Sequence, residues 1–310
     1  MKRTSQFFAV AVGLFGLVFP FIFGPYLQKV ASTIYTFMAL AITWDILLRS
    51  GQISFGIAGF YGLGSYATIL LVMKAGLPFW IAVPAGVLIA GFFAWVLGFL
   101  VLRLRGMYFS ITTLALAEIF RVIIHNWSEF TGGPEGLVLP SIIFGGESKA
   151  LYWALYATLL ITIGVSVWFE RSKFHFALTS IRDNEIAAST AGIDIFRTLL
   201  VTFTVTSLLQ GLIGAVNVVS VGFAMPESAF DANYTLLPLA IALLGGIHST
   251  VGPMIGALLL GATAEWLKLK IPYGHLAVYG LIIILVILFM PQGIRGLVRQ
   301  KLAERGTHHG

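Results

Sequence analysis

The sequence 170-ERSKFHFALTSIRDNEIAASTAGIDIFRT-198 separates two apolar segments of membrane length. It carries eight of the 32 Asp, Glu, Lys and Arg residues in the 310-residue chain. An uncharged run of 20 residues precedes it (150–169), and one of 28 follows it (199–226). Because about 18 or more residues without charge indicate a membrane span, residues 170–198 are expected to lie outside the bilayer. A soluble protein can reach them there.

The whole chain has the composition of an integral membrane protein. It is 58% hydrophobic and 10% charged, whereas about 25% of the residues of a soluble domain are charged. Uncharged runs of membrane length occupy residues 4–28, 50–73, 75–102, 198–226, 232–264 and 271–294. We therefore predict an all-α polytopic membrane protein with one transmembrane domain over residues 1–310, a bundle of about 8–10 helices.

The basic residues indicate how the chain is oriented. Lys and Arg in short loops mark the cytoplasmic side. With both termini cytoplasmic, 13 of the 19 basic residues lie inside, five lie outside (Lys29, Lys74, Lys149, Lys268 and Lys270), and Arg121 lies within a helix. This orientation puts residues 170–198 in the cytoplasm. Lys2 and Arg3 precede apolar residues as in a signal peptide, but no small-residue cleavage site follows, so the first helix is expected to be retained.

Two glycine-rich segments in opposite halves of the chain predict interrupted or re-entrant helices. Glycines crowd residues 51–66, and residues 233–244 span only about 18 Å before a glycine-rich turn at 245–253, too short to cross a core of about 30 Å. Broken helices expose backbone dipoles to a cavity and so mark a transport path. The alternative is close helix packing through the Gly252-x-x-x-Gly256 pair, and both interpretations stay open. Ten spans, or eight with two re-entrant segments, fit the pattern.

Two ion pairs are expected inside the predicted spans. Glu118 and Arg121 are three residues apart, and Asp45 and Arg49 are four apart, so each pair can meet on one helix face. Charges within spans usually face a bundle interior or a cavity. Glu118 and Arg121 would then line the outer mouth of a path, although the spacing favours a self-contained structural pair. The candidate path residues are Gln52, Ser54, Gly56, Glu118, Arg121, Gly245 and Gly246.

Several classes of function leave no signature in this sequence. The absence of cysteine excludes disulfides and thiolate metal sites. No H-x-x-H, H-E-x-x-H or G-x-x-x-x-G-K-[ST] motif is present, so neither a metal site nor ATP binding by the chain itself is predicted. The net charge of +6 is spread over helix ends and residues 170–198, which does not indicate nucleic-acid binding. We predict no enzyme activity and no cofactor.

At helical spacing, the polar segment presents two faces. Small side chains on one face would let a partner approach closely, and polar side chains on the other would supply hydrogen bonds. Gly192 is a plausible helix stop, because glycine accepts the left-handed conformation that ends many helices. The alternative is an ordinary solvated helix that joins two spans. The first face holds Asn184, Ala187, Ala188 and Ala191; the second holds Arg182, Glu185 and Ser189.

The string RDNEIAASTAGI (182–193) resembles the cytoplasmic loop of ABC importer permeases, in which a short helix docks into the ATP-hydrolysing subunit. Its pattern E-A-A-x-x-x-G is matched by Glu185, Ala187, Ala188 and Gly192, with Ile186 as one additional residue. Residues 104–121, 131–137, 171–185, 226–257 and 279–296 are similar to permeases of the high-affinity branched-chain amino acid importers. His248 stands where that family usually has glycine.

The resemblance implies a permease subunit of a bacterial ABC importer in the inner (plasma) membrane, carrying branched-chain or other hydrophobic amino acids. Its implied partners are two ATPase subunits that bind ATP and Mg, a second, non-identical permease subunit and a periplasmic binding protein. The implied ATPase-coupling residues, all within the loop 170–198, are Arg182, Asp183, Asn184, Glu185, Ala187, Ala188, Ala191 and Gly192. One alternative is a permease for urea, short amides or another amino acid. Another is an ion-coupled secondary transporter, with Glu118 or Asp45 as the coupling carboxylate.

Overall fold

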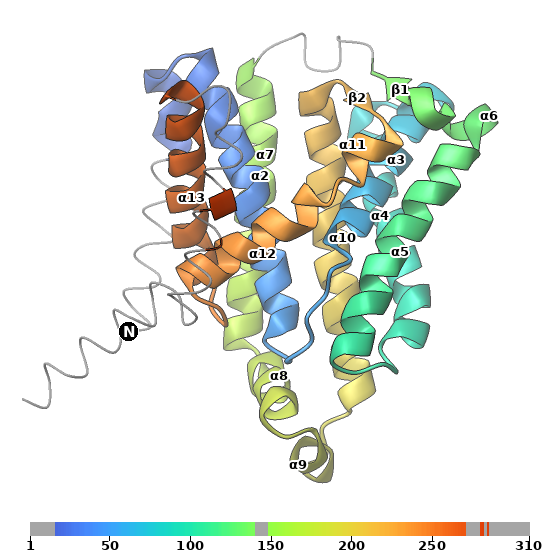
Figure 1. The fold of residues 1–310 in the computed structure, drawn as a ribbon, viewed down its shortest axis with the longest axis vertical. Coiled ribbons are helices and arrows are strands. Elements are labelled where there is room, and N and C mark those ends of the chain that lie inside the picture. Colours follow the sequence, from blue (N-terminus) through green and yellow to red (C-terminus); the bar gives the residue numbers. More distant parts are fainter. Residues whose placement is uncertain (1–15, 140–147, 271–279, 282–283, 285–310) are drawn as a thin grey trace, which may run out of the picture.

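The computed structural model describes residues 16–139, 148–270, 280–281 and 284, and these are almost entirely helical (Figure 1). Parts of the first predicted span, and most of the predicted last crossing at 276–290, lie outside the described residues. A helical stretch at 16–22 precedes the longer helices. These are α2 (Pro25–Leu48), α3 (Ile57–Met73), α4 (Phe79–Val101), α5 (Met107–Asn126), α7 (Ser148–Arg171), α10 (Ile195–Val221), α12 (Asn233–Gly245) and α13 (Val251–Lys270).

The helices confirm the predicted all-α polytopic membrane protein. Among the described residues, six helical segments are long and apolar enough to cross a membrane. They are α2, α4, α5, α10, most of α7 (from Lys149), and the segment Pro226–Gly245, which contains the four-residue α11 (Pro226–Ala229) and α12. The apolar α3 is shorter, at 17 residues.

Helices α2 and α10 form the centre of the bundle. Most of each is buried, whereas about two thirds of the apolar stretch of α4 and of α5 is not. Helix α10 packs against α3, α4, α2 and α7, and α2 packs against α7, α12 and α13. The outer faces of α4 and α5 carry exposed large apolar side chains such as Leu88, Phe92 and Ile111. Such faces suit a lipid environment, in which apolar side chains need no protein partner.

The α3–α10 contact depends on glycines that bring the two backbones together. A Cβ atom on Gly64 would lie 2.2 Å from the Gly211 carbonyl oxygen, and one on Gly214 would lie 2.0 Å from the Tyr61 carbonyl oxygen. Apolar side chains gain little by leaving lipid for another helix, so close approach through small residues contributes to the packing of such helices.

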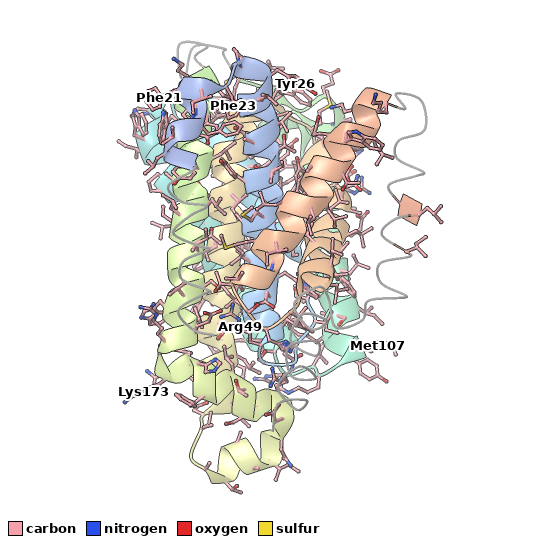
Figure 2. All side chains as sticks on the ribbon, turned by 90° about the vertical axis from the view of Figure 1, so that its left-hand side faces the viewer. Phe21, Phe23, Tyr26, Arg49, Met107 and Lys173 are labelled. Carbon is pink, nitrogen blue, oxygen red and sulfur yellow. The ribbon has the colours of Figure 1, made fainter. Side chains whose placement is uncertain are left out.

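The two ends of the bundle differ (Figure 1). At one end, which we call the α9 end, α8 (Lys173–Asp183) and α9 (Glu185–Thr190) project beyond the long helices. The other, the β-ribbon end, holds α6 (Ser128–Thr131), η1 (Gly133–Glu135), α11 and an antiparallel pairing of β1 (Leu137–Val138) with β2 (Phe223–Ala224). Figure 2 shows Lys173 and Arg49 toward the α9 end and Tyr26 at the opposite end.

The chain is interrupted at both predicted places. Residues 52–56 are not helical, and α3 begins at Ile57. Helix α12 ends at Gly245 after 13 residues, the turn 246–250 follows, and α13 begins at Val251. In Figure 1, α12 slants across the bundle and α13 returns beside it toward the β-ribbon end. The interruptions predicted from the glycine-rich segments are therefore confirmed.

A matched pair of glycine substitutions tests the close approach of α3 and α10. Gly64→Ala should destabilise the protein by about 1–3 kcal/mol, because the new methyl group forces a backbone shift in a tightly packed contact. Gly164→Ala is the control, since a Cβ atom there has open space within 4 Å and alanine favours a helix over glycine by about 1 kcal/mol. The stability of the two variants is compared by heating each sample and measuring the folded fraction by size-exclusion chromatography. Equal stability of the two variants would show that the α3–α10 contact does not need glycine.

Candidate coupling surface and polar network

The segment 170–198 folds into short helices because polar N-caps divide it. The Ser172 hydroxyl accepts a hydrogen bond from the Phe174 backbone N–H, and the Asn184 side-chain oxygen accepts one from Ala187 N–H at 3.0 Å. The Asp194 carboxylate accepts one from Arg197 N–H at 2.9 Å and starts α10. Each cap satisfies a backbone donor at the beginning of a helix. As a result α8, α9 and α10 point in different directions, and α9 forms the tip.

The structure corrects the predicted common face of small residues. Asn184 has extended backbone angles (φ −160°, ψ 107°), so one helix ends and another begins there. The helical spacing that aligned residues 182–191 therefore does not run through this position. Ala188 is 2% exposed and packs into the bundle, whereas Ala187 and Ala191 are exposed. Of the predicted face of Asn184, Ala187, Ala188 and Ala191, only Ala188 is buried, so it cannot contact a partner as predicted.

The predicted helix stop at Gly192 is confirmed. Gly192 has a φ angle of +83°. Its N–H donates to the Ser189 carbonyl at 3.0 Å, and the Ile193 N–H donates to the Ala188 carbonyl at 3.1 Å. These two bonds form a Schellman motif, which satisfies carbonyl groups at the end of α9.

Two exposed apolar side chains on the projecting helices were missed by sequence reasoning. Phe176 on α8 is 74% exposed, and Ile186 on α9 is 77% exposed. Ile186 appeared in the sequence only as an additional residue between Glu185 and Ala187. Together with Ala187, Ala191 and the neighbouring Asn184, these side chains give α8 and α9 a surface of small and apolar groups with polar groups beside them; we call it the coupling surface.

An ion pair fixes α9 to the connection between α4 and α5. The Arg105 guanidinium lies 2.7 Å from a Glu185 carboxylate oxygen, and both side chains are about two-fifths exposed. Beside it, Gly51 lies so close to Arg182 that an added Cβ atom would be 3.3 Å from the arginine side chain. Half-exposed pairs add little stability, but this one sets the position of α9 relative to the bundle. Arg105 and Glu185 are 80 residues apart, so no local pattern in the sequence predicted this pair.

A buried polar network joins three segments near the α9 end. The predicted Asp45–Arg49 pair is present at 3.0 Å, with exposed side-chain fractions of 0% and 5%. The same guanidinium donates to the Ser166 hydroxyl at 2.8 Å and lies 3.4 Å from Glu170. Burying such charges is costly unless they are paired and hydrogen-bonded. The arginine therefore ties α2 to α7.

The third segment of the network is the turn between α12 and α13. Glu170 accepts hydrogen bonds from the Thr250 N–H at 2.7 Å and the Thr250 hydroxyl at 2.8 Å. The other Asp45 oxygen accepts a bond from the His248 N–H. His248 has a φ angle of +64°, which is rare for a residue with a side chain. Burial, and then the positive charges of Arg182 and Arg49, lower the pKa of this imidazole to about 4.

Three candidate path residues lie together at the break before α3. Gln52 and Ser54 are buried, and the Ser54 hydroxyl accepts a hydrogen bond from Gly56 N–H at 3.2 Å. The buried Gln52 Oε1 has no hydrogen-bond partner among the described residues. In addition, the Ala58 N–H at the start of α3 donates to the Thr235 hydroxyl in the first turn of α12 at 3.1 Å. The two interrupted helices therefore meet, although the sequence offered no reason to pair their starts.

The other candidate path residues lie elsewhere. Glu118 and Arg121 form the predicted i,i+3 pair on the outer side of α5, with exposed side-chain fractions of 58% and 31%. Arg121 also lies 3.7 Å from Glu227 of α11. Gly245 belongs to the α12–α13 packing, because a Cβ atom there would lie 1.7 Å from the Gly252 carbonyl oxygen. No hydrogen bond or ion pair joins Glu118 or Arg121 to Gln52, Ser54 or Gly56 in the described part of the chain.

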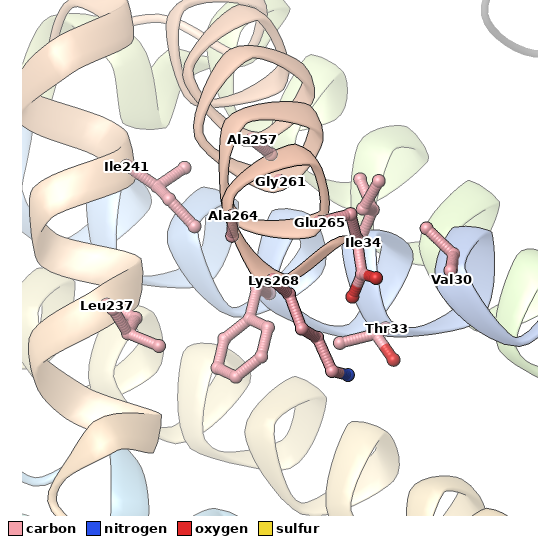
Figure 3. Close-up of a pocket in the computed structure, with 11 residues that line it drawn as sticks. Val30, Thr33, Ile34, Leu237, Ile241, Ala257, Gly261, Ala264, Glu265 and Lys268 are labelled. Carbon is pink, nitrogen blue, oxygen red and sulfur yellow. The ribbon is translucent and has the colours of Figure 1, made fainter. Parts of the chain in front are cut away.

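Two cavities flank α2 toward the β-ribbon end. One, of about 330 Å³, lies between α2, α10 and α12, and its polar lining residues are Lys29, Thr33, Thr36, Asn217 and Tyr234. The second, of about 220 Å³, lies between α2, α12 and α13 and is mostly apolar, with Glu265 and Lys268 among its lining residues (Figure 3). Thr33 and Phe37 line both. No group of three His, Asp or Glu residues that could hold a metal occurs in the described part of the chain.

Comparison with known proteins identifies related chains. The family model described as "Branched-chain amino acid transport system / permease component" matches residues 26–290. The permease protein LivM of a high-affinity branched-chain amino acid transport system in Escherichia coli K12 is 29% identical, over 96% of this chain and 76% of its own. LivH of Salmonella typhimurium LT2 is 27% identical over 84% of this chain and 91% of its own. A probable LivH of Methanocaldococcus jannaschii is 23% identical over 87% of this chain and 91% of its own.

Replacing Arg49 tests the network. Arg49→Met should destabilise the protein by about 3–5 kcal/mol, because it leaves the fully buried Asp45 carboxylate without its charge partner. Arg171→Met, at the exposed end of α7, is the matched control and should change stability by less than about 0.5 kcal/mol. Thermal unfolding of the two variants gives the comparison. An equally small loss of stability in the two variants would mean that the network does not hold the α9 end together.

Proposed function

The chain belongs to the family of permease components of branched-chain amino acid transport systems, and on this basis we propose that it is one of two permease subunits of an ATP-driven importer. The importer would sit in a bacterial inner membrane and carry branched-chain or other hydrophobic amino acids into the cytoplasm. ATP and Mg would be bound by two separate ATPase subunits. A second, non-identical permease subunit and a periplasmic binding protein would complete the assembly. The similarity of the chain to both LivM and LivH supports the pairing of two permeases.

The observation that carries this proposal is the projecting coupling surface. Helices α8 and α9 extend past the long helices (Figure 1) and expose Phe176 and Ile186. Exposed apolar side chains on a segment outside the membrane favour a protein partner. Small neighbours such as Ala187 and Ala191 would let the partner come close to the backbone. The ATPase subunit is the partner expected for such a surface in this family.

The polar network supports a route by which movement of the coupling surface reaches the membrane helices. Helix α8 follows α7 after the single residue Ser172, and Glu170 lies two residues before that junction. Glu170 holds Thr250 in the α12–α13 turn, while Glu185 holds Arg105 between α4 and α5. A displacement of α8 and α9 would therefore pull on α7, α10, the turn and the α4–α5 connection together. Rigid helices with two alternative packings can convert such a shift into alternating access.

The distribution of basic residues supports the direction of import. Arg49, Arg103, Arg105, Arg171, Lys173, Arg182 and Arg197 lie at the α9 end, whereas Lys29, Lys74, Lys149, Lys268 and Lys270 lie at the β-ribbon end. The more basic α9 end would face the cytoplasm. The β-ribbon end would then receive the amino acid from the binding protein.

An ion-coupled secondary transporter is less favoured by the geometry. Such a carrier needs a membrane carboxylate that binds and releases a cation. The two candidate carboxylates, Asp45 and Glu118, are each already engaged in an ion pair with an arginine, so neither is free to bind a transported cation.

Bulky substitutions on the coupling surface test the docking role. Ala187→Trp and Ala191→Trp should reduce recovery of the ATPase subunits with the purified permease by about tenfold or more, since a loss of 1.4 kcal/mol in binding is a factor of ten. Ala75→Trp, at another exposed alanine near the β-ribbon end, is the control and should leave recovery unchanged. Full ATPase recovery with the Ala187 and Ala191 variants would refute docking at this surface.

The energy source is tested by uptake. Membrane vesicles that contain the complete assembly should import labelled leucine only with ATP inside the cytoplasmic compartment and with the binding protein outside. A protonophore should leave this uptake nearly unchanged when ATP is supplied. Uptake that continues without ATP and collapses with the protonophore would instead identify a secondary transporter.

A further inference from the structure

The larger cavity beside α2 has the form of a binding pocket for a small solute. Its volume of about 330 Å³ is within the range of ligand pockets, about 300–1,000 Å³. Its rim is open, with Val221 43% and Phe223 39% exposed, and its inner wall is buried, with Thr36 3% and Asn217 9% exposed. The cavity therefore extends inward from the β-ribbon end.

The lining combines an apolar wall with a few polar groups. Phe37, Val221, Phe223 and the ring of Tyr234 form the apolar part. The polar part contains two threonine hydroxyls and the Asn217 amide. The only charged side chain among the lining residues is that of Lys29, whose ammonium makes no ion pair with any described residue. A pocket with this lining would accept a solute that carries both an apolar group and a carboxylate.

Tyr234, one of the lining residues, stacks on Tyr61 of α3. The rings of Tyr61 and Tyr234 have centroids 4.0 Å apart and planes inclined by 25°. The Asn217 amide donates to the Tyr61 hydroxyl at 2.5 Å, which fixes the Tyr61 ring. Tyr234 also stacks on Phe37 at 5.8 Å. The next residue, Thr235, accepts a hydrogen bond from the Ala58 N–H at the start of α3. Tyr234 and Thr235 therefore connect the wall of the cavity to α3, through the Tyr61 ring and the Ala58 N–H.

We propose that this cavity, between α2, α10 and α12, binds the transported solute as a free amino acid with an apolar side chain. The carboxylate would pair with Lys29, and the side chain would lie against Phe37, Phe223 and Tyr234. The Asn217 amide oxygen and the Thr36 hydroxyl oxygen would accept hydrogen bonds from the ammonium group of the solute. This proposal rests on the proposed import function and specifies where this chain holds the solute.

The charge of the pocket separates amino acids from related uncharged solutes. Urea and short amides lack the carboxylate that Lys29 would bind, and a cation would be repelled by it. Leucine has a carboxylate that can pair with the Lys29 ammonium and an apolar side chain that can pack against the apolar wall. Leucinamide has the same side chain and no carboxylate, so it serves as the matched probe.

Thiol labelling can test the pocket directly, because the chain contains no cysteine. Thr33 is exposed and lines the cavity, so the variant Thr33→Cys, in the complete assembly, offers one thiol at the proposed site. Labelling by a small methanethiosulfonate reagent should be slowed several-fold by leucine and not by leucinamide or urea. The variant Lys74→Cys places a thiol at the same end of the bundle outside the pocket, and leucine should not affect its labelling.

A second substitution tests the role of the lysine. In the Thr33→Cys background, Lys29→Gln should raise the leucine concentration needed for half-protection by about tenfold, the equivalent of 1.4 kcal/mol of lost interaction. Lys29→Arg keeps the charge and should restore protection, which shows that the Gln variant had not simply misfolded.

The outcomes separate this proposal from the import function. If the unsubstituted assembly imports leucine but leucine fails to protect the Thr33→Cys thiol, or protects it equally with Lys29→Gln, the pocket assignment is overturned and the import function stands. Protection by leucinamide equal to that by leucine also overturns it. If the unsubstituted assembly imports no amino acid, the import function itself fails, whatever the labelling shows.

Discussion

Arg49 is a charge held in the interior of a membrane helix bundle, and its partners determine how the α9 end is assembled. The guanidinium needs hydrogen-bond acceptors and a counterion, since an unpaired ion in an apolar environment is strongly destabilising. Asp45, Ser166 and Glu170 supply them, and Glu170 and Asp45 also hold the turn 246–250. Apolar contacts alone would not select this arrangement, because lipid competes equally well for apolar side chains. One buried ion therefore fixes the relative positions of α2, α7 and the α12–α13 turn.

The same principle explains where the helices are interrupted. Backbone polar groups freed by a break need partners inside a membrane protein. At the break before α3, Ser54 and Thr235 accept hydrogen bonds from backbone N–H groups. At the turn after α12, Asp45 and Glu170 do the same. Both breaks face the bundle interior around α2 and α12. The polar groups of the bundle thus gather along α2, α3 and α12, and away from Glu118 and Arg121 on the outer side of α5.

The coupling surface is connected to the bundle by polar contacts and helix caps. Ala188, Leu178 and Ile181 anchor α8 and α9 by burial, while Arg105–Glu185 and the cap at Asn184 set their direction. A short helix with two fixed ends moves as a unit with the spans to which it is tied. Such stiffness suits the proposed role of α8 and α9 in transmitting movement to the membrane helices.

The sequence alone determined the features that depend on near neighbours along the chain. Uncharged runs identified the membrane class, glycine density located both interruptions, Gly192 ended a helix, and the Asp45–Arg49 and Glu118–Arg121 pairs followed from helical spacing. The tertiary structure decided the contacts between residues 80 or more apart. It buried Ala188 of α9 against the bundle, added Glu170 and Thr250 to the Arg49 network, and placed Lys29 beside Asn217 and Tyr234. The helical period cannot show such contacts, because they arise from the packing of segments whose order in space is set by many weak interactions at once.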